Sequence, residues 1–303
     1  MNAHDYIDSF VTYLIAERHY SEATALVYAP ALSSLLEFVG MRYAVTDWGE
    51  VSDAHIREWV VQMMADKYST LTVNKKLSAV RSFYRYLLTK GVVSKNPTSK
   101  IRGPKNEKRL PEFVREGDMD KLLDNVKFAD DYGGRRDHLV LLLFYSTGIR
   151  LAELVGLDLN SVNFSNSTIR VLGKRNKERV VPFGAELRDE LLRYIELRNQ
   201  QEGADATTAL LLGPHGGRIS RSLVEKTVHT YLSQVTTLKK RSPHVLRHTF
   251  ATAMLNNGAE IEVVRQLLGH KSITTTEIYT HTTFEELKKA YAKAHPHADK
   301  DGE

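Results

Sequence analysis

The sequence contains no cysteine and no apolar segment of the length that crosses a membrane. Disulfide bonds and thiolate metal sites are therefore excluded. A membrane-spanning helix needs roughly 18 or more consecutive apolar residues, and no segment approaches that length. The opening stretch, MNAHDYIDSF, also lacks the basic and then apolar pattern of a secretory signal. Together these absences are consistent with a protein of the reducing cytoplasm that has no membrane anchor.

The chain also lacks a convincing cluster of acidic residues for binding a metal ion, so we expect neither a metal nor another cofactor. Its charge is mildly basic, with 42 Lys and Arg against 37 Asp and Glu, a net charge of +5 and a pI of about 9.1. Such an excess favours a polyanionic partner, most often a nucleic acid. A basic protein without that partner fits the total charge equally well, so the positions of the charges matter more.

The composition is typical of a globular protein that buries a core. Of the 303 residues, 42% are hydrophobic and 26% are charged. This length corresponds to about two domains of roughly 150 residues each. The sequence shows no internal repeat and no low-complexity segment.

Residues 1–95 are predicted to form a helical domain with four helices. The second helix is expected to end near Gly40, and Ser52 is expected to cap the third. The fourth contains an apolar stripe at helical spacing, formed by Val73, Leu77, Val80, Tyr84 and Leu87. Polar residues at the same spacing form the adjacent flank: Asn74, Ser78, Arg81 and Arg85. That flank either binds phosphates or is simply solvated.

Residues 96–110 are predicted to be a basic interdomain linker. They lie in the segment SKNPTSKIRGPKNEKRLP, which combines three prolines and a glycine with many basic residues. A basic linker suits a protein that wraps a polyanion, and it equally suits a plain soluble tether.

A second domain is predicted for residues 111–303. It begins with helices and contains a β-hairpin in STIRVLGKRNKERVVPF, where apolar residues alternate on both sides of a turn. The remainder is predicted to be helical. Its helix boundaries are expected at Gly148, at Ser242 and Pro243, at Gly258, at Gly269, and at a capping box of Thr283 with Glu286.

The segment HVLRHTF carries a candidate anion site close to a predicted helix start. His244 and Arg247 lie three residues apart and therefore share a face of that helix. Helix N-termini attract anions through unpaired N–H groups and the helix dipole. His248 follows His244 by four residues, which raises a zinc site as an alternative. Zinc-protease helices carry glutamate directly after the first histidine, however, and Val245 occupies that position.

Two further segments carry cations. Glu153 lies three residues after Arg150, where it can fix the orientation of the arginine or form only a surface ion pair of little energetic value. The segment GKRNKER places basic residues around the predicted hairpin tip, namely Lys174, Arg175, Lys177 and Arg179. A charged tip of this kind is either solvated or in contact with nucleic acid.

Tyr279, in the segment LGHKSITTTEIYTH, can act as a nucleophile if cations surround it. A tyrosine pKa of about 10 leaves the hydroxyl roughly 4 kcal/mol short of ionisation at neutral pH. Arginines can grip non-bridging phosphate oxygens, and histidine or lysine can move protons to and from the reacting oxygens. The groups that metal-free phosphoryl transfer needs are present as Arg150, Lys174, His244, Arg247, His270 and Tyr279.

These residues occur in four ordered motifs that resemble those of the tyrosine recombinase (phage integrase) family. The motifs are TGIRLAEL with Arg150, GKRNKERVVPF with Lys174, HVLRHTFAT with His244 and Arg247, and LLGHKSITTTEIYTH with His270 and Tyr279. Within that family the sequence is most similar to the bacterial Xer-type recombinases. The resemblance covers residues 111–290, and residues 1–95 resemble the core-binding domain of the family more loosely.

The resemblance implies a role for each matched residue. Tyr279 would attack the scissile phosphate, form a 3′-phosphotyrosine and release a 5′-hydroxyl. Arg150 and Arg247 would hold that phosphate, and Lys174 would be the general acid for the leaving oxygen. His244 would assist proton transfer at the tyrosine.

The remaining positions complete the expected site. His270 would hydrogen-bond a non-bridging oxygen, and Glu153 would support the site without reacting. Arg175 stands where the family leads us to expect a small residue such as glycine, a change that would stiffen the turn without touching the assigned chemistry. His281 gains no role.

The resemblance also implies a fold and partners. The fold would be mainly α, with a SAM-like core-binding domain followed by an α+β catalytic domain that contains a small β-hairpin or sheet and a C-terminal helix. That last helix would dock either on a neighbouring protomer or on its own domain. The partner would be a double-stranded DNA target site in the bacterial cytoplasm. It would be bound by a homo- or hetero-tetramer, with a cell-division DNA translocase as a candidate activator.

The implied activity is site-specific recombination without ATP or metal, because the phosphotyrosine bond conserves the energy of the broken phosphodiester. Chromosome dimer resolution is the favoured role, with a mobile-element integrase or an inversion enzyme as the alternative. Three other classes stay open on the residues alone. They are a type IB topoisomerase, a non-catalytic DNA-binding protein, and a metal-dependent nuclease that uses His244 and His248.

Overall fold

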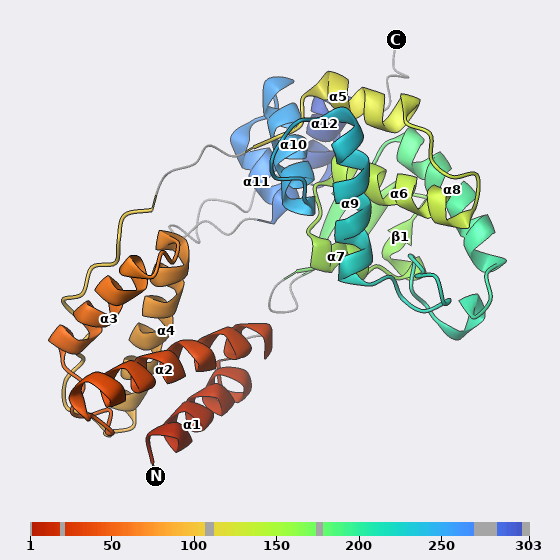
Figure 1. Cartoon of the computed structure of the whole chain (residues 1–303). Helices are drawn as coiled ribbons and strands as arrows, with labels where there is room; N and C mark the ends of the chain where they lie inside the picture. The colour runs from red at the N-terminus through yellow and green to blue at the C-terminus, as the bar shows by residue number, and fades with distance from the viewer. Residues whose placement is uncertain (1, 19–21, 107–111, 174–177, 270–283, 299–303) are drawn as a thin grey trace. The chain divides into compact units, whose positions relative to one another are not determined.

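The computed structural model describes residues 2–18, 22–106, 112–173, 178–269 and 284–298. The chain divides into two compact units, Met1–Arg109 and Leu110–Glu303. Both are dominated by helices, and the second holds a small antiparallel sheet (Figure 1). The predicted fold class, mainly α with a small sheet, is confirmed. Among the described residues, no helix is both long and apolar enough to cross a bilayer.

The first unit contains the four predicted helices. They are α1 (Ala3–Ala16), α2 (Glu22–Tyr43), α3 (Asp53–Ala65) and α4 (Thr70–Thr89). Ser52 caps α3 as predicted, because its side chain accepts a hydrogen bond from the backbone N–H of His55. The predicted helix end near Gly40 is wrong, since α2 continues to Tyr43. A glycine inside a helix costs only about 1 kcal/mol, which packing of the neighbouring turns readily offsets.

Aromatic side chains fill the core of this unit. Phe83 packs edge-on against both Phe10 and Trp48. The Trp48 indole donates a hydrogen bond to the carbonyl of Ala3, and the Tyr84 hydroxyl donates one to the carbonyl of Trp48. The predicted apolar stripe of α4 is fully buried in this core, so the sequence periodicity identified the packed face correctly.

The polar flank of α4 binds the segment that follows the helix bundle. The Asn74 amide donates to the carbonyl of Pro104 and to Asn106, and Arg81 donates to the carbonyl of Ile101. Gly103 lies so close to α4 that an added Cβ would sit 1.9 Å from Asn74 Oδ1. Two of the four flank residues therefore fix the chain leaving α4. Whether the rest of the predicted linker acts as a tether stays a prediction.

The second unit is built around one buried helix. Helix α6 (Tyr132–Thr147) packs against α8 (Ala185–Asn199), α9 (Arg221–Val235) and α10 (Pro243–Asn256), as Figure 1 shows. Its central residues, Leu139 to Leu143, are completely buried. The other elements are α5 (Glu116–Asp120), η1 (Lys121–Asn125), α7 (Leu151–Val155), η2 (Leu159–Ser161), η4 (Ala204–Ala206), α11 (Ile261–Leu268) and α12 (Phe284–Ala294).

The sheet has three antiparallel strands in the order β1 (Val162–Asn163), β2 (Thr168–Leu172) and β3 (Glu178–Pro182). Strands β2 and β3 form the predicted hairpin, with Ile169 opposite Val181 and Val171 opposite Arg179. Ile169, Val171 and Val181 are buried. The prediction that Arg179 belongs to the charged tip is wrong, because Arg179 lies within β3 and only 13% of its side chain is exposed.

Helix α12 packs on its own unit. Tyr291 and Ala294 join an apolar cluster with Phe250 of α10 and Leu267 of α11. The next residue beyond the helix, His295, is buried, and its ring hydrogen-bonds the carbonyl of Tyr145. Within this chain the helix packs intramolecularly, and docking on a neighbouring protomer stays a prediction. Thr283, the predicted cap of α12, lies outside the described residues.

Candidate active site

Arg150 and Glu153 form the first part of the site, at the start of α7. The Arg150 backbone N–H donates to Glu153 Oε2 at 2.7 Å, and its Nη1 donates to Oε1 at 2.8 Å. The Glu153 carboxylate is almost completely buried, whereas 37% of the Arg150 side chain is exposed. This pair is therefore not the solvated surface contact that the sequence left open. It presents a fixed guanidinium to a ligand.

Gly148 lets the chain turn from α6 into α7 at this point. It has φ of 58° and ends α6 in the left-handed conformation. A Cβ there would lie 2.4 Å from Phe250 Cδ1 and 2.9 Å from Leu268 Cδ2. Both the backbone angle and the space therefore require glycine, and the prediction of a helix end at Gly148 is confirmed.

Arg247 lies beneath this turn and joins two helix ends. Its Nη1 donates to the carbonyl of Gly148 and its Nη2 to the carbonyl of Leu268, both at 2.6 Å. These carbonyls end α6 and α11, where the helix dipole favours a cation. Burial, and then the positive charges of Arg150 and Arg179, lower the pKa of Arg247 to about 9. The side chain thus carries its charge at neutral pH within a crowded cationic cluster.

Arg179 completes the cluster from β3. Its Nη1 and Nη2 donate to the two carboxylate oxygens of Glu153 at 2.7 and 2.9 Å. Its Nε donates to the carbonyl of Leu267 at 2.8 Å. Sequence reasoning missed this position, although the alternation of β3 carried a signal. Arg179 lies two residues before the buried Val181 and so points to the same side of the strand.

Glu153 is the counter-ion of the cluster. Burial disfavours its ionisation, but hydrogen bonds from Arg179 and Arg150 outweigh that effect and lower its pKa to about 2. One carboxylate thus binds the guanidinium groups of Arg150 and Arg179, and its charge also acts on Arg247. The excess positive charge suits an anionic ligand such as a phosphodiester.

The two histidines of α10 lie beside this cluster. His244 is exposed in the first turn of α10, three residues before the buried Arg247. Burial, followed by the nearby charges of His244 and Arg247, lowers the pKa of His248. No group of acidic or histidine side chains suited to a metal ion occurs within the described residues.

Three of the predicted site residues, Lys174, His270 and Tyr279, lie outside the described residues. The chain that leads to them is described. Gly269 ends α11 with φ of 64°, as predicted, and its carbonyl lies 3.4 Å from Arg150 Nη2. Helices α11 and α12, which flank residues 270–283, pack together in one cluster. The described chain therefore reaches the arginines at Gly269, directly before the segment that holds Tyr279.

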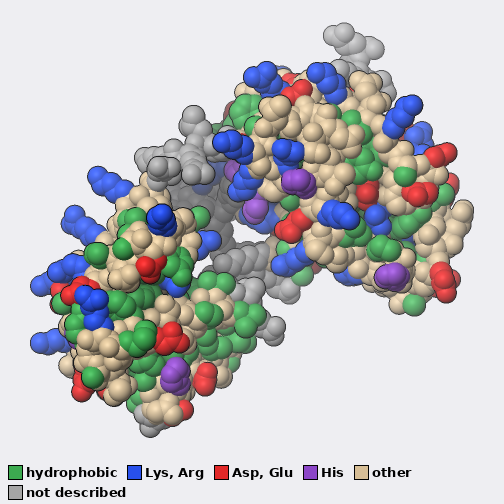
Figure 2. Space-filling model, viewed as in Figure 1, with side chains coloured by type: hydrophobic (Ala, Val, Ile, Leu, Met, Phe, Trp, Pro, Cys, Tyr) green, Lys and Arg blue, Asp and Glu red, His purple; other side chains and the backbone are tan. Residues whose placement is uncertain are grey.

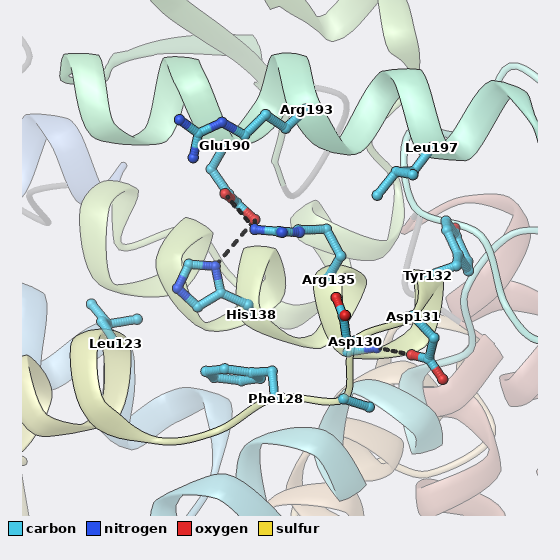
Figure 3. Close-up of a pocket in the computed structure, with 12 residues that line it drawn as sticks. Leu123, Phe128, Asp130, Asp131, Tyr132, Arg135, His138, Glu190, Arg193 and Leu197 are labelled. Atoms are coloured by element: carbon cyan, nitrogen blue, oxygen red, sulfur yellow. Dashed lines mark hydrogen bonds and ion pairs between the residues drawn. The ribbon is translucent and has the colours of Figure 1, made fainter.

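A separate cavity of about 630 Å³ lies between α6 and α8 (Figure 3). Arg135 and His138 both contact Glu190 there, with Phe128 at the edge. Burial opposes ionisation of Glu190, yet the contacts with His138 and Arg135 lower its pKa overall. Arg150, His244 and Arg247, the predicted site residues that the structure describes, do not line this cavity, so it is separate from the arginine cluster.

Comparison with known proteins places this site in a family. Residues 112–286 match the model of the phage integrase family, and residues 7–91 match the model of the phage integrase N-terminal SAM-like domain. This chain belongs to the phage integrase family. Its enzyme class is that of the tyrosine-type site-specific recombinases, as the resemblance implied.

Curated relatives agree over nearly the whole chain. The tyrosine recombinase XerC of Listeria innocua is 36% identical over 291 residues, which are 95% of this chain and 97% of the relative. The tyrosine recombinase XerC of Chlorobaculum tepidum is 34% identical over 318 residues, with coverage of 97% and 95%. The predicted resemblance to the Xer type is confirmed.

Solved structures confirm the fold. The XerH site-specific recombinase bound to its palindromic difH substrate aligns with a TM-score of 0.72 at 20% identity, over 91% of this chain and 81% of that one. The Tn1549 transposon integrase in complex with circular intermediate DNA aligns with a TM-score of 0.70 at 18% identity, over 95% and 98%.

Proposed function

We propose that this chain recombines DNA at a specific site by a phosphotyrosine mechanism. The observation that carries the proposal is the cluster of Arg150, Arg179 and Arg247 around the buried Glu153. Guanidinium groups fixed in advance stabilise the charge that develops on a phosphate as it is attacked. They also favour ionisation of a nearby tyrosine, whose deficit at neutral pH is roughly 4 kcal/mol.

In the cleavage step, the Tyr279 oxygen attacks the scissile phosphorus, and the bond from phosphorus to the 5′ oxygen breaks. The tyrosine proton passes to a base, with His244 in the assisting role, and Lys174 protonates the leaving 5′ oxygen. Arg150 and Arg247 hold the non-bridging oxygens, and His270 donates to one of them. The resulting 3′-phosphotyrosine keeps the energy of the broken bond, so a 5′-hydroxyl of the partner strand can reverse the step without ATP or metal.

The proposed substrate is a double-stranded DNA site. Lys and Arg side chains appear on the visible faces of both units, interspersed with acidic ones (Figure 2). Most contacts would be to phosphates, which position the protein, while a smaller number would read the bases. The similar structures of XerH and of the Tn1549 integrase are complexes with DNA. Such a substrate implies action in the bacterial cytoplasm.

Recombination joins two sites, so we propose a tetramer of identical or paired recombinases on two DNA duplexes. Helix α2 of the first unit exposes apolar side chains that a neighbouring protomer would cover in such an assembly. Leu26 is 73% exposed and Met41 is 85% exposed. Resolution of chromosome dimers, with activation by a cell-division DNA translocase, is the proposed role. Integration or inversion of a mobile element is the alternative within the same chemistry.

The chemical proposal is tested with a duplex that carries the target site, found by mapping where the protein binds the chromosome. A nick near the cleavage point lets a short fragment diffuse away and traps the covalent intermediate. Tyr279→Phe should form no protein–DNA adduct, whereas Tyr231→Phe should match the wild type, because the Tyr231 ring merely stacks on Phe128. Equal adduct from Tyr279→Phe would refute the mechanism. Binding near the replication terminus would support chromosome dimer resolution, and binding at mobile elements would favour the alternative.

A further inference from the structure

We propose that Arg179 is a positioning residue that holds the phosphate-binding arginine, the hairpin and the turn before His270 in one register. This inference rests on the function proposed above, since it concerns how the assigned residues are held. Nothing in the four sequence motifs required a role for Arg179.

The contacts of Arg179 reach three parts of the site. Its two terminal nitrogens bind both oxygens of Glu153, which in turn orients Arg150. Its Nε binds the carbonyl of Leu267 in the last turn of α11. Its own backbone lies in β3, the strand that leads back from Lys174. One side chain therefore joins β3, α7 and α11.

The turn at Gly269 packs closely on the Arg179 side chain. A Cβ on Gly269 would lie 3.1 Å from Arg179 Cδ and 3.3 Å from its Nε. Gly269 has φ of 64° and ends α11 in the left-handed conformation. The arginine thus fills the space beneath the turn, and the absence of a side chain on Gly269 makes room for it.

Charge balance explains why a cation is needed here. Without Arg179, the buried carboxylate of Glu153 would have Arg150 as its nearest cation. The two hydrogen bonds from Arg179 to the carboxylate oxygens would be lost. Arg150 would then be drawn further onto Glu153 and away from a bound phosphate. A lysine would restore the charge, but its donors share one nitrogen and lack the planar fork that reaches both Glu153 oxygens and the Leu267 carbonyl.

Arg179→Met and Arg179→Lys test the proposal, with Arg170→Met as the matched control. Arg170 lies on the neighbouring strand of the same hairpin, is half exposed, and makes only a 4.0 Å ion pair with Glu178. Single-turnover cleavage of the nicked duplex is measured at saturating DNA, and affinity is measured separately by titration. Thermal unfolding checks that each variant is folded.

We expect Arg179→Met to cleave about 100-fold more slowly, with DNA affinity changed by less than about threefold, because misplaced groups lose rate more than binding. Arg179→Lys should recover about tenfold of that loss, and Arg170→Met should stay within about twofold of the wild type. In a Glu153→Gln background, Arg179→Met should cost far less than in the wild type, because the two residues act as one unit.

Two results would overturn the inference. One is wild-type cleavage by Arg179→Met. The other is a pair of findings: the cleavage-rate losses of Arg179→Met and Glu153→Gln simply add, and Arg179→Lys recovers none of the loss. That pair is what a merely destabilised variant would give. Both leave the wild-type adduct intact, so they are distinguishable from failure of the proposed function. If the proposed function failed, the wild type itself would form no adduct at Tyr279.

Discussion

Substituting Gly148 by alanine tests the junction between α6 and the arginine cluster. Its φ of 58° places the residue in the left-handed region, which costs an L-residue about 1–2 kcal/mol. The new Cβ would also meet Phe250 at 2.4 Å and Leu268 at 2.9 Å, and overpacking of this kind costs about 1–3 kcal/mol. We therefore expect the second unit to lose about 2–5 kcal/mol of unfolding free energy.

Function should fall together with stability. The carbonyl of Gly148 accepts the Arg247 Nη1 hydrogen bond, so a displaced turn displaces Arg247. We expect single-turnover cleavage by the folded variant to fall by about 10- to 100-fold. Gly117→Ala is the matched control, because an added Cβ on Gly117 would have no neighbour within 4 Å and the backbone there is helical.

The assay separates the two units by their spectra. Both tryptophans, Trp48 and Trp59, lie in the first unit, so tryptophan fluorescence reports its unfolding alone. Far-UV circular dichroism in urea reports both units. Gly148→Ala should shift the dichroism transition and leave the fluorescence transition unchanged. A second unit as stable as that of Gly117→Ala would refute the geometry described for this turn.

Three other predictions follow from the structure. Gly103→Ala should destabilise the first unit by about 1–3 kcal/mol, seen as an earlier fluorescence transition in urea, because its Cβ would displace the Asn74 amide from its partners. A hydrogen bond to Glu186 raises the pKa of His297; burial partly offsets this effect, and Asp120 adds to it. The protonated His297 ring therefore stabilises the fold fully below about pH 6.5, and this stabilisation is lost as the pH rises through the pKa of His297 in the folded state. The melting temperature of the second unit should therefore exceed that of His297→Gln at pH 6 by more than at pH 8, and equal differences would contradict this. Finally, DNA affinity should fall steeply as the salt concentration rises. Cleavage should persist when a metal chelator is added, and inhibition by the chelator that added zinc reverses would favour a metal-dependent nuclease.

Much of the fold could be predicted because it follows from local patterns. The stripe from Val73 to Leu87 is buried at helical spacing, Ser52 caps α3, and Gly148 and Gly269 end helices where the sequence indicates. Each of these depends on neighbours within a few residues. The end of α2 was misplaced because packing carries the helix past Gly40.

The missed features depend on contacts between distant segments. Arg179 belongs to a charge-dense stretch, which by composition is expected to be solvated, and only its Glu153 and Leu267 partners explain its burial. The flank of α4 offered polar groups for a phosphate, yet Asn74 and Arg81 instead hold the segment after the bundle. Composition cannot distinguish a cation that binds DNA from one that binds the protein's own carbonyls.

The central claim is that Tyr279 becomes covalently joined to a 3′ phosphate of DNA. Its most direct test is to trap the adduct on a nicked duplex, digest the protein, and locate the nucleotide by mass spectrometry. We predict a single modified peptide, with the nucleotide on Tyr279 and a free 5′-hydroxyl on the released strand. Modification of any other residue, or a linkage to the 5′ end, would contradict it.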